Sequence, residues 1–277
     1  MTMTRALTAG LDRGVLELRQ LLRSPRDVFT QLSTPLMFIV LGSVLDGDIP
    51  GSTVPMAELM AAGGVATMVI QAGLLTLTQA LAVEREDGTL LRVKTLPGGI
   101  RAYLIAKTFV MVVTALGGAA LMLLGGTAVL GSSLPSDATR WLTLVSVLVL
   151  GLVALAPIGA IIGSLLPNSR EALGTVMIPL FALMMFSGIY FPVTVLPELA
   201  QNVVEAFPLK WIAQGVRAAL LPDSALAAET ANSWELDKVY LIVGLWAVVG
   251  FLFAPRVLHR MTHRESGSRL KRNESAR

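Results

Sequence analysis

Hydrophobic positions gather in long stretches along the chain, separated by short polar segments. A helix needs about 20 apolar residues to cross a hydrocarbon core of ~30 Å. Six stretches reach or approach that length, and a buried helix of a soluble protein is usually shorter. The pattern predicts an all-α integral membrane protein with six transmembrane helices, at residues 28–45, 59–83, 104–130, 141–166, 172–190 and 239–254.

Composition agrees with a lipid environment. Of the 277 residues, 54% are hydrophobic and only 15% are charged, and the mean hydropathy is +0.69. Soluble domains carry about 25% charged residues, whereas a surface that faces lipid needs far fewer. The chain has no cysteine, which excludes a disulfide framework, a thiolate metal site and a cysteine nucleophile.

Basic residues lie mostly on one side of the predicted spans. Eighteen of the 22 Lys and Arg residues precede the first span or follow the second, fourth and sixth, and the other four lie on the opposite side. Because cytoplasmic segments are rich in Lys and Arg, both termini are predicted to be cytoplasmic. The net charge of +3 therefore reflects topology, and we expect no nucleic-acid partner.

The N-terminal segment, residues 1–27, predicts an amphipathic helix. Leu7, Leu11, Val15, Leu18 and Leu22 recur three or four positions apart and form one apolar stripe. A helix of this kind lies in the membrane interface with its apolar face toward lipid. The alternative is a helical leader that only anchors the chain. We divide the protein into this helix, a transmembrane domain at 28–257 and a basic tail at 258–277.

The segment at 84–97 is charged and directly follows an uncharged span. Gly88 can end the helix of the span and Thr89 can cap a new short helix, which Pro97 would end. The segment predicts a short charged helix at the cytoplasmic surface, placed to transmit force from a soluble partner. A loop that only sets topology is the other interpretation.

A second informative segment, at 193–221, lies on the predicted outer side. Leu196, Leu199, Val203 and Phe207 follow helical spacing, and Pro208 interrupts it. The apolar run at 211–221 is too short to cross a membrane. We expect short re-entrant helices buried in the protein, and the alternative is an amphipathic hairpin on the surface.

Both segments resemble a known family. The run Glu84-Arg85-Glu86-Asp87-Gly88-Thr89-Leu90, followed by Leu96-Pro97, looks like the cytoplasmic loop of ABC-2 type permeases. These are membrane subunits of bacterial ABC exporters, including the type related to daunorubicin resistance. Phe186 to Pro192, Leu196-Pro197, Phe207-Pro208-Leu209-Lys210-Trp211 and Arg217 are similar to the stretch between that family's fifth and sixth spans. The family usually has Asn where this chain has Phe207, so the motif does not identify the substrate.

The resemblance implies a mechanism and partners. The chain would be the permease of an ATP-driven exporter in the bacterial plasma membrane, moving a hydrophobic drug, lipid or glycoconjugate outward by alternating access. Residues 1–27 would form the connecting helix. Two permeases, identical or paralogous, would work with two ABC ATPase subunits that hold ATP and Mg²⁺, so this chain would need no cofactor. The residues expected to couple it to the ATPase are Glu84, Arg85, Glu86, Gly88, Thr89, Leu90 and Arg92.

Two groups of residues inside the predicted spans are candidates for a substrate path. Thr67, Gln71 and Thr78 share one face of the second span, and polar groups in a membrane face protein or water. Two interpretations are open: these side chains line a substrate path, or they join helices by hydrogen bonds. The fifth span offers a soft apolar surface, although simple packing also explains it; its residues are Phe181, Met184 and Met185. In the fourth span, the Gly159–Gly163 pair has the spacing of a close-packing helix face.

Several functional classes lack the residues that they need. A phosphate-binding loop requires Gly-Lys-Ser/Thr, and no lysine of this chain follows glycine. No carboxylate lies inside a predicted span, whereas a proton-coupled carrier needs one. His259 and His263 are four positions apart, but no carboxylate pairs with them in a buried setting and the segment is basic, so we expect no metal site. The alternatives to the exporter subunit are a stand-alone carrier and a membrane-embedded lipid-modifying enzyme.

Overall fold

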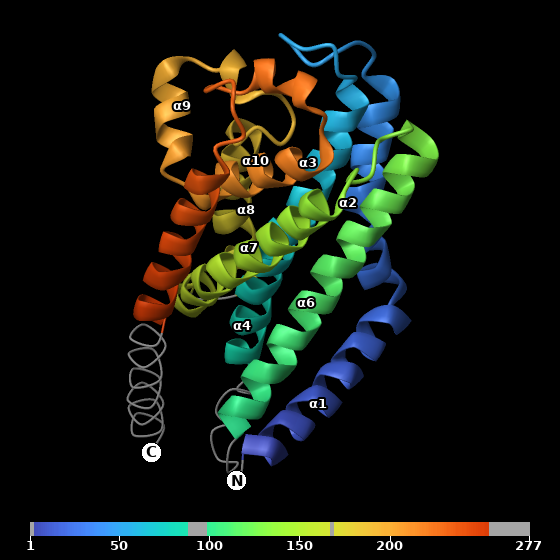
Figure 1. The fold of residues 1–277 in the computed structure, drawn as a ribbon. Coiled ribbons are helices and arrows are strands. Elements are labelled where there is room, and N and C mark those ends of the chain that lie inside the picture. Colours follow the sequence, from blue (N-terminus) through green and yellow to red (C-terminus); the bar gives the residue numbers. More distant parts are fainter. Residues whose placement is uncertain (1–2, 88–98, 167–168, 255–277) are drawn as a thin grey trace, which may run out of the picture.

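A computed structural model describes residues 3–87, 99–166 and 169–254 (Figure 1). Within these ranges the chain consists of helices and loops and contains no β-strand. In chain order the helices are α1 (Met3–Arg23), α2 (Pro25–Val44), α3 (Met56–Ile70), α4 (Leu77–Glu86), α6 (Gly99–Gly125), α7 (Ala138–Leu165), α8 (Ser169–Phe186), α9 (Glu198–Glu205), α10 (Pro208–Leu220) and a last helix, Leu236–Ala254. Two π-helical segments, η1 (Gln71–Thr76) and η2 (Gly126–Leu130), and two 3₁₀ turns, η3 (Val193–Val195) and η4 (Asp223–Ala228), complete it.

Five helical stretches among the described residues are long and apolar enough to cross a membrane. They are Pro25–Val44, Met56–Glu84, Gly99–Leu130, Ala138–Leu165 and Leu236–Ala254. The predicted class, an all-α integral membrane protein, is confirmed. The described apolar part of α8, Val176–Phe186, is shorter than these stretches, so the sixth span stays a prediction.

Local signals explain where two of the spans begin. The Ser24 hydroxyl accepts a hydrogen bond from the Asp27 amide, and Pro25 occupies the first position of α2. At α7, the Asp137 carboxylate accepts from the Arg140 amide at 2.9 Å. Each side chain satisfies a backbone donor that the first helical turn leaves free.

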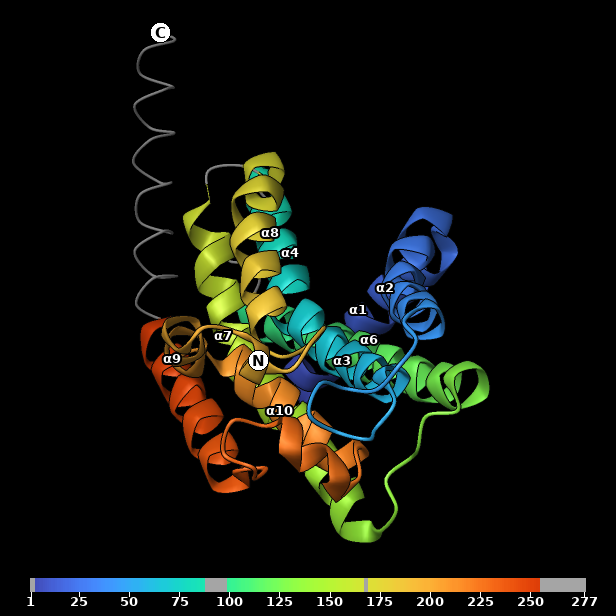
Figure 2. The ribbon, with the colours of Figure 1, turned by 90° about the horizontal axis from the view of Figure 1, so that it is seen from above.

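The second span forms the centre of the bundle. α3, η1 and α4 run consecutively, with α2 and α6 packed on one side and α7, α8 and α10 on the other (Figures 1 and 2). In its most apolar window 83% of this span is buried, against 22% for Pro25–Val44 and for Leu236–Ala254. The central span therefore packs against neighbouring helices on both of its sides.

Glycines on α7 allow it to approach this central span closely. A Cβ atom on Gly159 would lie 2.7 Å from the Gly73 carbonyl oxygen, and one on Gly163 would lie 2.6 Å from the Thr78 carbonyl oxygen. Real Cβ atoms do not come so near to backbone atoms, so only glycine fits. The close-packing face predicted from the Gly159–Gly163 spacing is confirmed.

The N-terminal helix α1 packs along α6 (Figure 1) through a face of small residues, Ala6, Gly10 and Gly14. A Cβ on Gly10 would lie 2.7 Å from the Ile105 Cβ, so α6 needs glycine there. The leucine side stays exposed, with Leu7 47% and Leu22 64% accessible. α1 thus has one face for protein and another suited to lipid, while its place in the membrane interface stays a prediction. We call this end of the bundle the α1 end and the opposite end, with α9 and α10, the cap end.

Candidate functional site

A cluster of four charged side chains joins three helices at the α1 end. The Lys107 ammonium of α6 lies 2.8 Å from Glu17 Oε2 on α1 and 2.7 Å from Glu84 Oε1 on α4. Arg13 of α1 lies 2.9 Å from Glu17 and 3.8 Å from Glu84. Arg13 and Lys107 also face the Tyr103 ring, at 5.2 and 5.7 Å from its centroid, within the range of a cation–π interaction. We call Arg13, Glu17, Glu84 and Lys107 the ion cluster.

The ion cluster is partly shielded from water, which strengthens it. The Lys107 and Glu84 side chains are only 14% and 15% exposed, and charges interact more strongly in such surroundings than in bulk water. Burial raises the pKa of Glu17, but hydrogen bonds from Lys107 and Arg13 outweigh burial and leave the pKa below its ordinary value. Glu17 is therefore charged at neutral pH, and its carboxylate loses that charge only in acid.

The structure brings one predicted coupling residue, Glu84, into this cluster. Arg85, whose backbone alone is described, and Glu86 follow it in the last turn of α4. Gly88, Thr89, Leu90 and Arg92 lie outside the described residues. Sequence reasoning missed Arg13 and Glu17 as partners of Glu84, because no local pattern relates them. The sequence did contain one indication of a charge cluster: Lys107 is the only charged residue inside the predicted third span, and a charge in a span needs a partner.

The polar residues of the central span make hydrogen bonds to other helices or to their own helix. The buried Thr67 hydroxyl donates to the Gly63 carbonyl one turn earlier. The buried Thr78 hydroxyl lies 3.0 Å from the Gly159 oxygen of α7 and 2.6 Å from the Leu74 oxygen. Gln71, half-buried at the start of η1, donates to Thr34 of α2 at 3.0 Å. Thr67 and Thr78 thus serve packing, and Gln71 is the most accessible of the three.

Three aromatic rings connect α2 with α8 and with the segment that follows α8. Phe38 of α2 stacks on Tyr190 at 5.2 Å between centroids, and Phe181 of α8 lies 6.3 Å from the same ring. Phe181 is 57% exposed, Met185 is half-buried and Met184 is buried. Phe181 and Met185 therefore offer an accessible apolar surface, whereas Met184 belongs to the core.

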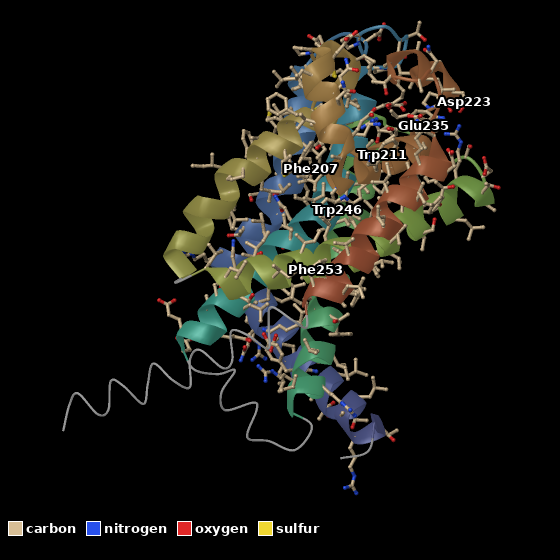
Figure 3. All side chains as sticks on the ribbon, turned by 90° about the vertical axis from the view of Figure 1, so that its left-hand side faces the viewer. Phe207, Trp211, Asp223, Glu235, Trp246 and Phe253 are labelled. Carbon is tan, nitrogen blue, oxygen red and sulfur yellow. The ribbon has the colours of Figure 1, made fainter. Side chains whose placement is uncertain are left out.

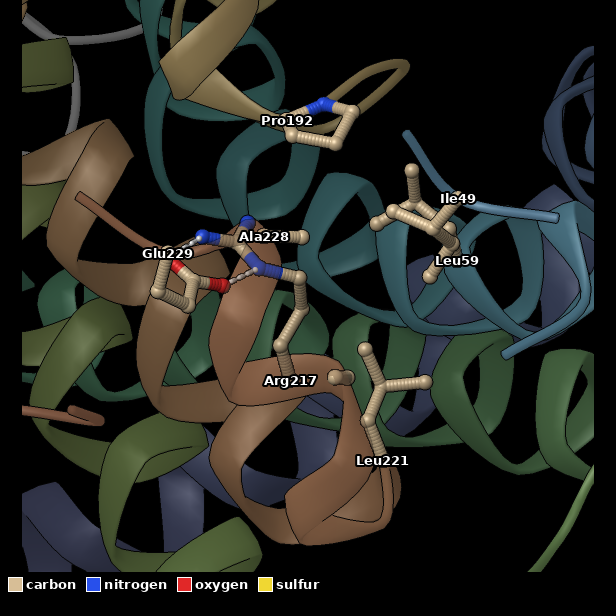
Figure 4. A pocket seen from close by; sticks show the side chains of 8 residues that line it. Ile49, Leu59, Pro192, Arg217, Leu221, Ala228 and Glu229 are labelled. Carbon is tan, nitrogen blue, oxygen red and sulfur yellow. Dashed lines mark hydrogen bonds and ion pairs between the residues drawn. The ribbon is translucent and has the colours of Figure 1, made fainter. Parts of the chain in front are cut away.

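At the cap end, α10 is buried along its whole length, including its polar stripe Lys210, Gln214 and Arg217. Arg217 makes a bidentate ion pair with Glu229, at 2.6 and 3.0 Å (Figure 4). Its guanidinium also donates to the Gly188 carbonyl at 2.6 Å. The adjacent cavity measures ≈ 10 Å³, room for about one water. This cavity is too small for a substrate. We therefore assign the Arg217–Glu229 pair a structural role at the cap end.

No group of three or more His, Cys, Asp or Glu side chains within 3–87, 99–166 and 169–254 could hold a metal ion. His259 and His263 lie outside these residues. Nothing in the described part therefore adds a metal centre to the ion cluster and the cap.

Together these features define an all-α integral membrane protein whose N-terminal helix is tied by charge to its central span. The family model described as ABC-2 type transporter matches residues 13–221, well over half of the chain. The chain belongs to the ABC-2 type transporter family and is a membrane transporter permease. The match extends from Arg13 of the ion cluster through α10. A search of curated proteins finds no match to the chain.

Proposed function

We propose that the chain is the permease subunit of an ATP-driven exporter. It moves a hydrophobic drug, lipid or glycoconjugate out of the cytoplasm or the inner leaflet by alternating access. Membership in the ABC-2 family supports transport, and the ion cluster is the observation that carries the coupling proposal. It ties Glu84, at the beginning of the charged segment 84–97, to both α1 and α6.

The proposed coupling step starts at the ATPase and passes through this cluster. An ATPase that docks on residues 85–97 displaces the end of α4. Since Lys107 binds Glu84 and Glu17 at once, α1 and α6 follow that displacement. Glu84 faces other helices of its own chain, so it is a positioning residue, and the residues after it provide the docking surface.

The proposed substrate path runs beside Gln71, Phe181 and Met185. Gln71 lies in a π-helix, a form that often occurs at functional sites. The accessible Phe181 and Met185 suit an apolar substrate. Thr67, Thr78 and Met184 support these residues from the core.

The remaining parts of the proposal concern the assembly. A second permease, identical or paralogous, and two ABC ATPase subunits complete the transporter, and the ATPases bind ATP and Mg²⁺. The distribution of Lys and Arg supports cytoplasmic termini, and membership in the ABC-2 family supports a place in the bacterial plasma membrane.

Replacing Arg85 and Arg92 by Glu should uncouple the permease from its ATPase. The double change reverses two charges on the proposed docking segment and alters no residue of the ion cluster. We expect copurification of the ATPase, and its stimulation by the permease, to fall about tenfold, the effect of roughly 1.4 kcal/mol. Exchanging the exposed Arg19 and Arg23 of α1 for Glu makes the same charge change and serves as the control. Unchanged copurification and ATP turnover in the Arg85/Arg92 variant would remove the docking assignment.

A further inference from the structure

The junction between α9 and α10 is a sharp turn whose carbonyl groups need donors. α9 ends at Glu205, Ala206 follows it, Phe207 is extended, and Pro208 begins α10. The last carbonyls of a helix have no partner within it. We call residues 205–208 the elbow.

Two tryptophan indole groups supply those donors, one from α10 and one from the last helix. Trp211 of α10 donates its Nε1–H to the Glu205 carbonyl at 2.7 Å. Trp246 of the last helix, 40 residues along the chain from Ala206, donates to the Ala206 carbonyl at 2.9 Å. The elbow is therefore bound both to its own cap and to the last helix.

An aromatic contact strengthens the attachment to the last helix. The rings of Phe207 and Trp246 lie 6.4 Å apart at an angle of 17°, a stacked pair of the kind that stabilises proteins beyond simple burial. Figure 3 shows the rings of Phe207, Trp211 and Trp246 close together in that view. Trp246 thus holds the elbow by both its N–H group and its ring.

A buried cation stiffens the other side of the elbow. The Lys210 ammonium is fully buried, lies 3.5 Å from the centroid of the Trp211 ring and 3.5 Å from Glu205 Oε1. It bridges the end of α9 and the beginning of α10 by charge. Bending at the elbow would expose this cation or separate it from its carboxylate, so the elbow favours motion as a rigid unit.

We propose that Trp246 is a positioning residue that makes the elbow and the last helix move as one body when the cap end opens. This inference rests on the proposed export function, because it concerns the exit of the substrate. The last helix would then pull the cap aside through the Trp246 contacts, and release of substrate would follow movement of that helix. A Trp246 that merely anchors the helix in the membrane interface predicts no such link.

Substitutions of Trp246 separate its two contacts. In liposomes that contain the permease and its ATPase, ATP-driven transport is measured with a hydrophobic fluorescent dye and a fluorescent phospholipid. Trp246→Phe keeps a ring and loses the donor, and we expect transport per folded complex to fall about fivefold. Trp246→Leu loses both contacts, and we expect a loss of about tenfold or more. Trp141→Phe, on the exposed side of α7, is the control and should transport normally.

The absence of cysteine allows a test by rescue. Phe207→Cys with Trp246→Cys removes both contacts, and we expect slow transport. Joining the two thiols with a short bismaleimide, which forms one thioether at each cysteine, should restore transport to within about twofold of the wild type, since this covalent bridge replaces the lost contacts. Each single-cysteine variant, treated alike, should not recover.

Two results would overturn the inference: normal transport by Trp246→Leu, or a cross-link that blocks transport, since blockage means that elbow and helix must separate. If Trp246→Leu does not fold, Trp246→Phe and the cross-linked pair decide. A wild-type complex that hydrolyses ATP but moves neither probe would contradict the proposed function itself, which distinguishes the two failures.

Discussion

Arg217→Met should destabilise the folded protein by about 3–5 kcal/mol, the usual cost of removing one partner from a buried ion pair. Arg217 is 3% exposed and Glu229 is 7% exposed, so the substitution leaves a carboxylate in the cap with no cation. The Gly188 carbonyl also loses its donor. Thermal unfolding of the purified protein in detergent measures the effect.

Two further variants separate the ion pair from general damage to the cap. Arg217→Met combined with Glu229→Gln removes both charges and should recover much of the lost stability, because replacing a whole buried pair is often neutral. Lys238→Met disrupts the more exposed Lys238–Glu235 pair and should leave the melting temperature nearly unchanged. If the single and double variants unfolded at the same temperature, the ion pair would not be what stabilises the cap.

Lys107→Glu should abolish coupling between ATP hydrolysis and transport while leaving membrane insertion intact. The change places a third carboxylate beside Glu17 and Glu84, with Arg13 as the only cation left in the ion cluster. Like charges at this distance repel, so α1, α4 and α6 lose their common attachment. We expect ATP-driven transport to fall by about tenfold or more, measured with the ATPase still bound.

The matched control changes the same charge on the same helix. Arg101→Glu alters an exposed residue of α6 and should transport nearly normally. Exchanging the charges, with Lys107→Glu and Glu84→Lys together, rebuilds one pair between α4 and α6 and should restore part of the activity. Equal losses in the single and exchanged variants would mean that Lys107 acts through something other than its ion pairs.

The sequence alone was sufficient to predict features that depend on a pattern of residues along one helix. Apolar length identified five membrane-spanning stretches of the six predicted, and the leucine spacing predicted the helix α1 with an exposed leucine side. The Gly159–Gly163 spacing identified the face that approaches the central span. In each case a pattern along one segment is enough for the prediction, because it does not depend on which residues the neighbouring helix carries.

Features that depend on contacts between segments far apart in the sequence could not be predicted from such patterns. Glu17 and Lys107 are 90 residues apart, and neither has a local pattern that names the other. For the segment that holds Lys210 and Arg217, the sequence left open burial in the protein or a position on the surface, and the structure buries all of α10. The π-helix at Gln71 packs against α6 and α7, and no residue type in the sequence predicts it.

Reconstitution with and without the ATPase tests the central claim most directly. The purified permease, alone or with its ATPase, is placed in liposomes, and accumulation of a hydrophobic dye is followed after ATP is added. We expect movement against a gradient only when the ATPase is present, because this chain has no phosphate-binding loop of its own. Uphill transport by the permease alone would contradict the account.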